Sequence, residues 1–213
     1  MKQILPYFNI GSSFGGNQDW FRDISMRGGG CAAVTAIETC IYLDLYKGTS
    51  LCPFDARAVD KNDFLAFGKI IKPYLRPRLS GIDTLDIYID GFGDYLKSKN
   101  AAVSISGVEG DTPYFEAVAA LKEQIDSGYP VPYLNLHHKD KRFKDYEWHW
   151  FMINGYEDSA NGVFVRASNY SDYEWLDFSD LYNTGCDKKG GLIIIKTEKK
   201  ILSCDFFKIP RLF

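Results

Sequence analysis

The 213-residue sequence has few of the features that would assign it to several common classes of protein. It contains only three histidines, and its five cysteines are an odd number without a C-x-x-C pair, which argues against a zinc site and against a disulfide framework. Lys and Arg together number 25 against 28 Asp and Glu, so we expect no nucleic-acid partner. No 18 apolar residues follow one another, which argues against a membrane-spanning helix.

The ten residues before Gly11 include one lysine and no sustained apolar run. We therefore expect no signal peptide, a cytoplasmic protein, and no membrane, metal or cofactor partner. The chain is 46% hydrophobic and 25% charged, which is typical of one globular domain with a sizeable core.

The most informative stretch is 26–37, in which three glycines run directly into Cys31. Apolar residues then recur at three- and four-residue spacing, which predicts a helix from Cys31 to near Gly48 with one buried face. First-turn amides and the helix dipole favour a thiolate at this position, so the pattern predicts a lowered pKa for Cys31. The alternative is a small buried cysteine at the start of a core helix, which is the commoner case for a lone cysteine.

The remaining pattern predicts an α+β fold in one domain, 1–213, with a mainly helical part (1–100) and a mainly β part (101–213). We expect 1–30 to form an extended, glycine-punctuated arm with at most a short turn near 19–24. Further predicted helices cover 62–71, 85–99 and a segment from Thr112, as the capping residue, to Ser127. Predicted strands cover 102–107, 131–136, 149–156, 163–168 and 192–197.

The segments 148–156 and 162–169 form a predicted hairpin, because the run between them ends in an Asn-Gly turn signal. If Tyr156 pairs with Gly162, the same register places His149 opposite Asn169, with Cβ atoms roughly 5 Å apart. An amide placed there can hold an imidazole toward a nucleophile. The alternative is a packed sheet histidine and a strand-ending asparagine, and a slip of one residue would place the two on opposite faces.

These motifs together resemble the papain-like cysteine peptidase superfamily, and most closely its bacteriocin-processing (double-glycine) peptidase-like branch. The motifs are Gly29-Gly30-Cys31-Ala32-Ala33 opening a helix, 128–132 before a strand, 149–156 and a strand ending in Ser168-Asn169. They span most of 17–197 in the papain order Cys, His, Asn. That branch more often has Asp-Pro where this chain has Asn169-Tyr170, and asparagine is the papain residue.

The resemblance implies a two-lobed fold and a peptidase acting on peptide or amide bonds through a thioester. Cys31 would be the nucleophile, His149 the general base and then acid, and Asn169 the residue that orients the imidazole. Gln18 would complete the oxyanion hole, although it lies 13 residues before Cys31, farther than in papain, and Asn17 is the alternative.

Two other functions remain open on the same scaffold: an acyltransferase or amidase, and a catalytically silent binding domain. Four aromatic residues are expected either to wall the cleft and shield the His149–Asn169 pair or to pack in the core: Trp20, Trp148, Trp150 and Tyr170.

Overall fold

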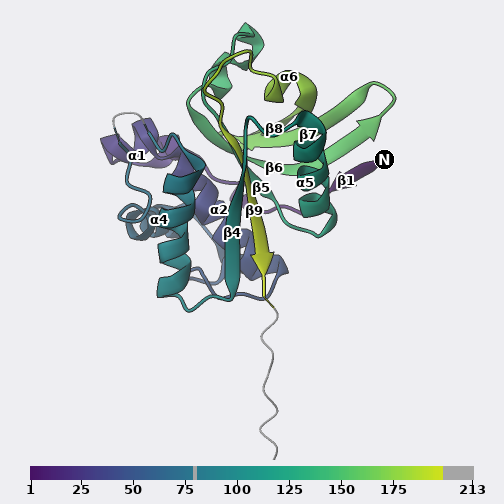
Figure 1. Cartoon of the computed structure of the whole chain (residues 1–213). Helices are drawn as coiled ribbons and strands as arrows, with labels where there is room; N and C mark the ends of the chain where they lie inside the picture. Colours follow the sequence, from purple (N-terminus) through teal and green to yellow (C-terminus); the bar gives the residue numbers. More distant parts are fainter. Residues whose placement is uncertain (79–80, 199–213) are drawn as a thin grey trace, which may run out of the picture.

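The computed structural model describes residues 1–78 and 81–198, so Cys204 lies outside the described part. Seven strands form one sheet: β1 (Lys2–Ile4), β4 (Val103–Glu109), β5 (Val131–Asn135), β6 (His149–Ser159), β7 (Gly162–Asn169), β8 (Asp172–Asp177) and β9 (Gly191–Thr197). Their order is β4-β9-β5-β6-β7-β8, with β1 paired to β6, and the paired strands are antiparallel (Figure 1). The expectation of an α+β fold with a largely antiparallel sheet is therefore confirmed.

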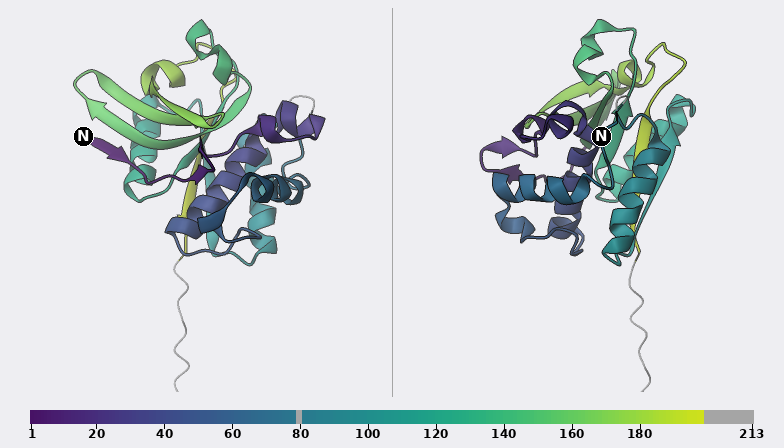
Figure 2. Two further views of the ribbon diagram at one scale, coloured as in Figure 1. Left: turned by 180° about the vertical axis from the view of Figure 1, so that it is seen from behind. Right: turned by 90° about the vertical axis from the view of Figure 1, so that its left-hand side faces the viewer.

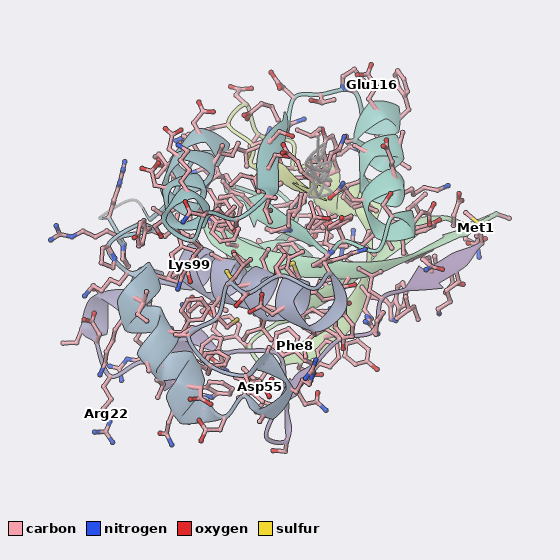
Figure 3. The ribbon with its side chains drawn as sticks, turned by 90° about the horizontal axis from the view of Figure 1, so that it is seen from below. Met1, Phe8, Arg22, Asp55, Lys99 and Glu116 are labelled. Carbon is pink, nitrogen blue, oxygen red and sulfur yellow. The ribbon has the colours of Figure 1, made fainter. Side chains whose placement is uncertain are left out.

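The helices are α1 (Ile24–Gly29), α2 (Cys31–Tyr46), α3 (Lys61–Ile71), α4 (Leu85–Ser98), α5 (Tyr114–Asp126) and α6 (Phe178–Tyr182), with short 3-10 helices η1 (Gln18–Trp20), η2 (Ala56–Ala58) and η3 (Lys141–Tyr146). Strands of the sheet are contacted by α2, α4, α5 and α6. A small separate hairpin pairs β2 (Asn9–Ile10) with β3 (Ser13–Phe14). Helix α2 packs against both β6 and α3 (Figure 2). Helix α5, whose first turn carries Glu116, lies across the sheet from α2 (Figure 3).

Helix α2 forms where the periodicity predicts it, from Cys31 to Tyr46. Small residues such as Ala32, Ala33 and Ala36 are fully buried and let neighbouring elements approach the helix closely. The helix ends before Gly48, whose φ of +69° is the left-handed conformation that glycine adopts most easily. The helices predicted at 62–71 and 85–99 are confirmed as α3 and α4.

The predicted cap of α5 is wrong, because Pro113 and not Thr112 is the residue that precedes its first turn. Pro113 has an extended ψ of 135°, and no side chain caps the helix. Thr112 belongs to a turn, and its carbonyl accepts a 2.7 Å hydrogen bond from the Tyr182 hydroxyl.

The expectation of an irregular arm over 1–30 is also wrong, because this stretch contains β1, the β2–β3 hairpin, η1 and α1. Asp23 explains α1: its carboxylate accepts a hydrogen bond from the Met26 amide, 3.1 Å away, and forms a 2.5 Å ion pair with Lys72, the residue that follows α3. A good N-cap and a tertiary contact thus outweigh the helix-weakening effect of Gly28 and Gly29.

Candidate active site

Three segments that are far apart in the sequence meet at one end of the sheet: the start of α2, the start of β6 and the end of β7. Cys31, His149 and Gln18 line an open cleft of about 610 Å³. The same three residues, with Asn169, also border a much smaller hollow of about 20 Å³ on the inner side. That volume has room for about one water molecule. The structure thus brings all four predicted site residues together.

His149 and Asn169 are joined by a 2.7 Å hydrogen bond between the imidazole Nε2 and the amide Oδ1. An amide oxygen only accepts hydrogen bonds, so Nε2 carries the proton and Nδ1 keeps a lone pair. Asn169 therefore holds the ring in the tautomer that leaves Nδ1 able to take up a proton.

The hairpin that carries this pair does not have the predicted register. Near the turn, Ser159 pairs with Gly162, and the ladder then shifts by one residue at a β-bulge between Ile153 and Tyr156. Continued past Met152 and its partner Ser168, the shifted ladder places Asn169 opposite Phe151, two residues from His149. His149 and Asn169 are therefore diagonal neighbours on one face, and the direct pairing predicted from the sequence is wrong.

The bulge decides which face His149 occupies, because side chains alternate along a strand. Without the extra residue, Asn169 would lie opposite Met152 and His149 would point to the other face of the sheet. Two contacts hold the bulge: the Asn154 side chain accepts a 2.5 Å hydrogen bond from Arg166 Nε, and the Asn154 carbonyl accepts one of 3.0 Å from the Leu5 amide.

Gly30 determines how closely α1 runs into α2. A Cβ atom at Gly30 would lie only 2.3 Å from the Met26 carbonyl oxygen, so no other residue fits this junction without a shift. The junction directs Cys31 to the edge of the cleft, where it is 7% exposed.

The electrostatics of Cys31 differ from the expectation based on its helix position. Burial raises the pKa of the thiol, although the backbone amides of Trp150, Ala32 and Cys31 itself act in the opposite direction. Burial also lowers the pKa of His149, against the upward effect of its hydrogen bond to Asn169. Both groups are therefore neutral near pH 7. Within 1–78 and 81–198, the thiol makes no hydrogen bond to the imidazole.

Gln18 reaches the site because η1 and α1 fold the 12 residues between Gln18 and Cys31 back on themselves. Its Nε2 donates a 3.1 Å hydrogen bond to the Arg27 carbonyl, and one amide proton remains available. Its Oε1 is buried and has no partner among the residues that the structure describes. The Asn17 side chain instead caps η1 by accepting a 2.8 Å hydrogen bond from the Asp19 amide.

Two of the four aromatic residues line the cleft, namely Trp148 and Tyr170. Tyr170 stacks on His149 with ring centroids 5.2 Å apart and an interplanar angle of 3°. Its φ is +48°, and that of Ser171 is +69°, in the two-residue turn between β7 and β8 where Asn and Gly are usual. Trp148 also has a positive φ, +52°. Left-handed backbone at bulky residues is strained and is common at functional sites.

The other two tryptophans pack elsewhere. Trp20 contacts Phe64 of α3 edge-on, and the Trp150 ring is buried against Tyr88 with its Nε1 donating to the Ile82 carbonyl. The rings of Trp20 and Trp150 therefore pack in the core and do not wall the open cleft. The backbone amide of Trp150 nevertheless lies near the Cys31 sulfur.

One further ionisable residue borders the inner hollow, Glu38 of α2. The sequence pattern gave it no role. The signal that marks it is a single carboxylate on the buried side of an apolar helix, seven residues after Cys31.

No cluster of three or more His, Cys, Asp and Glu suited to a metal ion occurs in the part of the chain that the structure describes. None of the helices described there is long and apolar enough to cross a membrane. Comparison with family models, curated proteins and solved structures finds no match to this chain, so the geometry of the site is the basis for assigning a function.

Proposed function

We propose that the protein is a papain-like cysteine peptidase that cleaves peptide or amide bonds, with Cys31 as nucleophile. The observation that carries the proposal is the His149–Asn169 hydrogen bond, which leaves Nδ1 unprotonated in a cleft whose wall includes the Cys31 thiol. A nucleophile, a base and a group that orients the base are the three parts of a catalytic triad.

In the proposed mechanism, the Cys31 sulfur attacks the carbonyl carbon while the thiol proton passes to His149 Nδ1. The tetrahedral oxyanion then collapses, the C–N bond breaks, and the amine leaves with the proton from the imidazolium. Water attacks the thioester, again losing a proton to Nδ1, and the acid product and the thiol are restored. Because both partners are neutral at rest, proton transfer accompanies the attack.

The oxyanion would be bound by the Cys31 backbone amide, at the start of α2, and by the free amide proton of Gln18. One such donor typically supplies about 2.7 to 4 kcal/mol of transition-state stabilisation. We propose this role for Gln18 and not for Asn17, because Gln18 lines the open cleft together with Cys31, whereas Asn17 borders only the inner hollow.

The arrangement of the elements supports the papain-like superfamily as the origin of the site. A cysteine-headed helix packs against an antiparallel sheet, and two strands of that sheet supply a histidine and an asparagine. We propose that the site resembles that of the bacteriocin-processing peptidase-like branch, from which it differs at Asn169.

An acyltransferase or amidase is the second candidate. The cleft carries two carboxylates, Asp145 and Glu147, beside the exposed ring of Trp148. Carboxylates and an aromatic face both attract a cationic amine. After losing a proton to His149 Nδ1, such an amine would attack the thioester in place of water and release the Cys31 thiol.

The acyl-enzyme step can be tested with p-nitrophenyl acetate. The wild-type protein should release close to one equivalent of p-nitrophenolate in a burst and gain one acetyl group on Cys31, detected by peptide mass spectrometry. Cys31→Ala should show no burst, whereas Cys186→Ser, which alters a partly exposed cysteine outside the cleft, should keep it. A wild-type protein without a burst, or a burst that survives Cys31→Ala, would leave a binding domain as the better explanation. Added primary amines that capture the acetyl group faster than water would favour the acyltransferase.

A further inference from the structure

Glu38 is a buried carboxyl group directly behind the candidate catalytic residues. It follows Cys31 by two turns of α2, so the two side chains share one face of the helix. Only 3% of the residue is exposed, and it borders the inner hollow together with Cys31 and His149.

The segment before Gln18 is shaped around this carboxyl group. The Gly16 amide donates a 2.6 Å hydrogen bond to Glu38 Oε1. At Gly15, where φ is +70°, an added Cβ atom would lie only 2.5 Å from the same oxygen. The chain can approach the carboxylate this closely only because it has glycine at that position.

The peptide of Gly16 also contacts the turn that follows Asn169. Its carbonyl accepts a 3.5 Å hydrogen bond from the Ser171 hydroxyl, and the Phe14 amide donates to the Ser171 carbonyl at 3.1 Å. Gly16 thus connects α2, which carries Cys31, with the β7–β8 turn, and Gln18 lies two residues further along the chain.

Burying a carboxylate as the acceptor for the Gly16 amide is energetically unfavourable, because burial strongly disfavours the charged form. Burial raises the pKa of Glu38 to about 7, against the opposing effects of the Gly16 amide and Tyr7. No Lys or Arg forms an ion pair with it in the described part of the chain, and the buried Arg166 bonds to Asn154 and Leu5 instead.

We propose that Glu38 is a positioning residue, which holds the Gly15–Gln18 segment against α2 and so fixes the Gln18 amide beside the Cys31 sulfur. The inference rests on the proposed acyl-transfer function, because it concerns the oxyanion donor of that reaction.

The test compares two reactions of Cys31 that differ in their need for an oxyanion hole. Acetylation by p-nitrophenyl acetate passes through a tetrahedral oxyanion as the C–O bond breaks and p-nitrophenolate leaves. Alkylation by iodoacetamide displaces iodide at a CH₂ carbon and forms no oxyanion. Glu38→Ala should slow the burst by at least about tenfold and by no more than about 10³, the upper end of what one oxyanion donor supplies. It should leave the alkylation rate within about twofold of the wild type.

Three variants make the result specific. Glu38→Gln keeps an acceptor for the Gly16 amide and should restore most of the burst rate. Glu38→Asp shortens the side chain by one methylene and moves the acceptor away from the Gly16 amide. It should slow acetylation without slowing alkylation, so it tests the role of Glu38 even if the alanine variant does not fold. Thr39→Val removes a buried hydroxyl from the same helix, which donates to the Thr35 carbonyl and borders neither hollow, and should change neither rate.

Two outcomes would overturn the inference alone: a normal burst in both Glu38→Ala and Glu38→Asp, or an equal slowing of acetylation and alkylation. A wild-type protein without a Cys31-dependent burst would instead remove the proposed function, and the role of Glu38 with it.

Discussion

Two hollows meet at Cys31 and His149, and they differ in size and in lining. The outer cleft, about 610 Å³, is bordered by charged and aromatic side chains, among them Asp145 and Trp148. The inner hollow, about 20 Å³, is bordered by buried groups of α2 and the sheet, among them Glu38 and Ser168. A substrate can enter only the outer one. The inner one can affect a reaction only by fixing where the reacting groups lie and how they titrate.

The two sides are also built differently. The outer wall uses backbone in unusual conformations, since Trp148 and Tyr170 both have positive φ. The inner wall consists mostly of regular helix and strand, from α2, β6 and β7, and is completed by residues 16–18 and Tyr170. Substitutions on the outer side should therefore change rates with little effect on stability, and substitutions on the inner side should change both.

The largest effect is expected for the base. His149→Ala should reduce the burst rate by about 10²–10⁴, the usual contribution of general acid–base catalysis. His137→Ala is the matched control, because His137 is an exposed loop residue, and it should keep the wild-type rate. Stopped-flow measurement of p-nitrophenolate release checks both. If His149→Ala releases p-nitrophenolate as fast as the wild type, His149 is not the base for the reaction of Cys31.

The next effect distinguishes Gln18 from its neighbour. Gln18→Ala should lower the acetylation rate by about 10²–10³, the effect of losing one oxyanion donor, without slowing alkylation by iodoacetamide. Asn17→Ala should cost about 1 kcal/mol in the free energy of unfolding, because it removes a helix cap, and should leave acetylation nearly unchanged. The opposite result would assign the oxyanion donor to Asn17.

The inner side should respond to pH through Glu38, which faces Tyr7 of the N-terminal segment, the Gly16 amide, and Cys31 and His149 across the hollow. Its pKa is raised from 4.5 to about 7, so its contribution to stability is present below pH 4.5 and is lost as pH rises to 7. Glu38→Gln removes this loss.

The free energy of unfolding of Glu38→Gln, relative to the wild type, should therefore increase between pH 4.5 and pH 8 by up to about 3 kcal/mol. Urea unfolding at the two pH values measures the difference, and Thr39→Val provides a reference without a titrating group. A difference between Glu38→Gln and wild type that stays constant with pH would mean that the Glu38 carboxyl is not desolvated.

The smallest effect is expected for the orienting residue. Asn169→Ala should lower turnover about tenfold, equivalent to about 1.4 kcal/mol of transition-state stabilisation. It should also lower the pKa of His149 further, because the hydrogen bond that raises it is lost. Asn169→Asp retains an acceptor for the His149 imidazole. Its negative charge should raise the pKa of His149 and so move the acid limb of the pH–rate profile to higher pH. Identical pH profiles for the three proteins would argue against an orienting role.

Much of the local structure follows from the sequence. The periodicity after Cys31 and the glycine at 48 predict α2 to within two residues of its end, and Pro73 marks the end of α3. Helices of this kind depend on nearest neighbours along the chain, where propensity and pattern are informative. The four residues singled out in the sequence, Cys31, His149, Asn169 and Gln18, border one hollow, and their catalytic roles stay predictions.

Other features depend on contacts between distant segments, and the sequence did not predict them. The strand β8 and the helix α1 have weak patterns of their own, and each is stabilised by its partners in the fold. The thiol pKa was predicted from the helix dipole alone, whereas burial by the sheet reverses its direction.

The sequence by itself determined which chemical groups are present and, for Cys31, His149 and Asn169, the helix and the strands that carry them. Only the tertiary structure decided which face His149 occupies, since that depends on a bulge held by Arg166 and by Leu5, a residue more than 140 positions earlier than His149. The physical reason is the two-residue repeat of a strand: one extra residue reverses every side chain beyond it, and its energy comes from contacts that no local pattern contains.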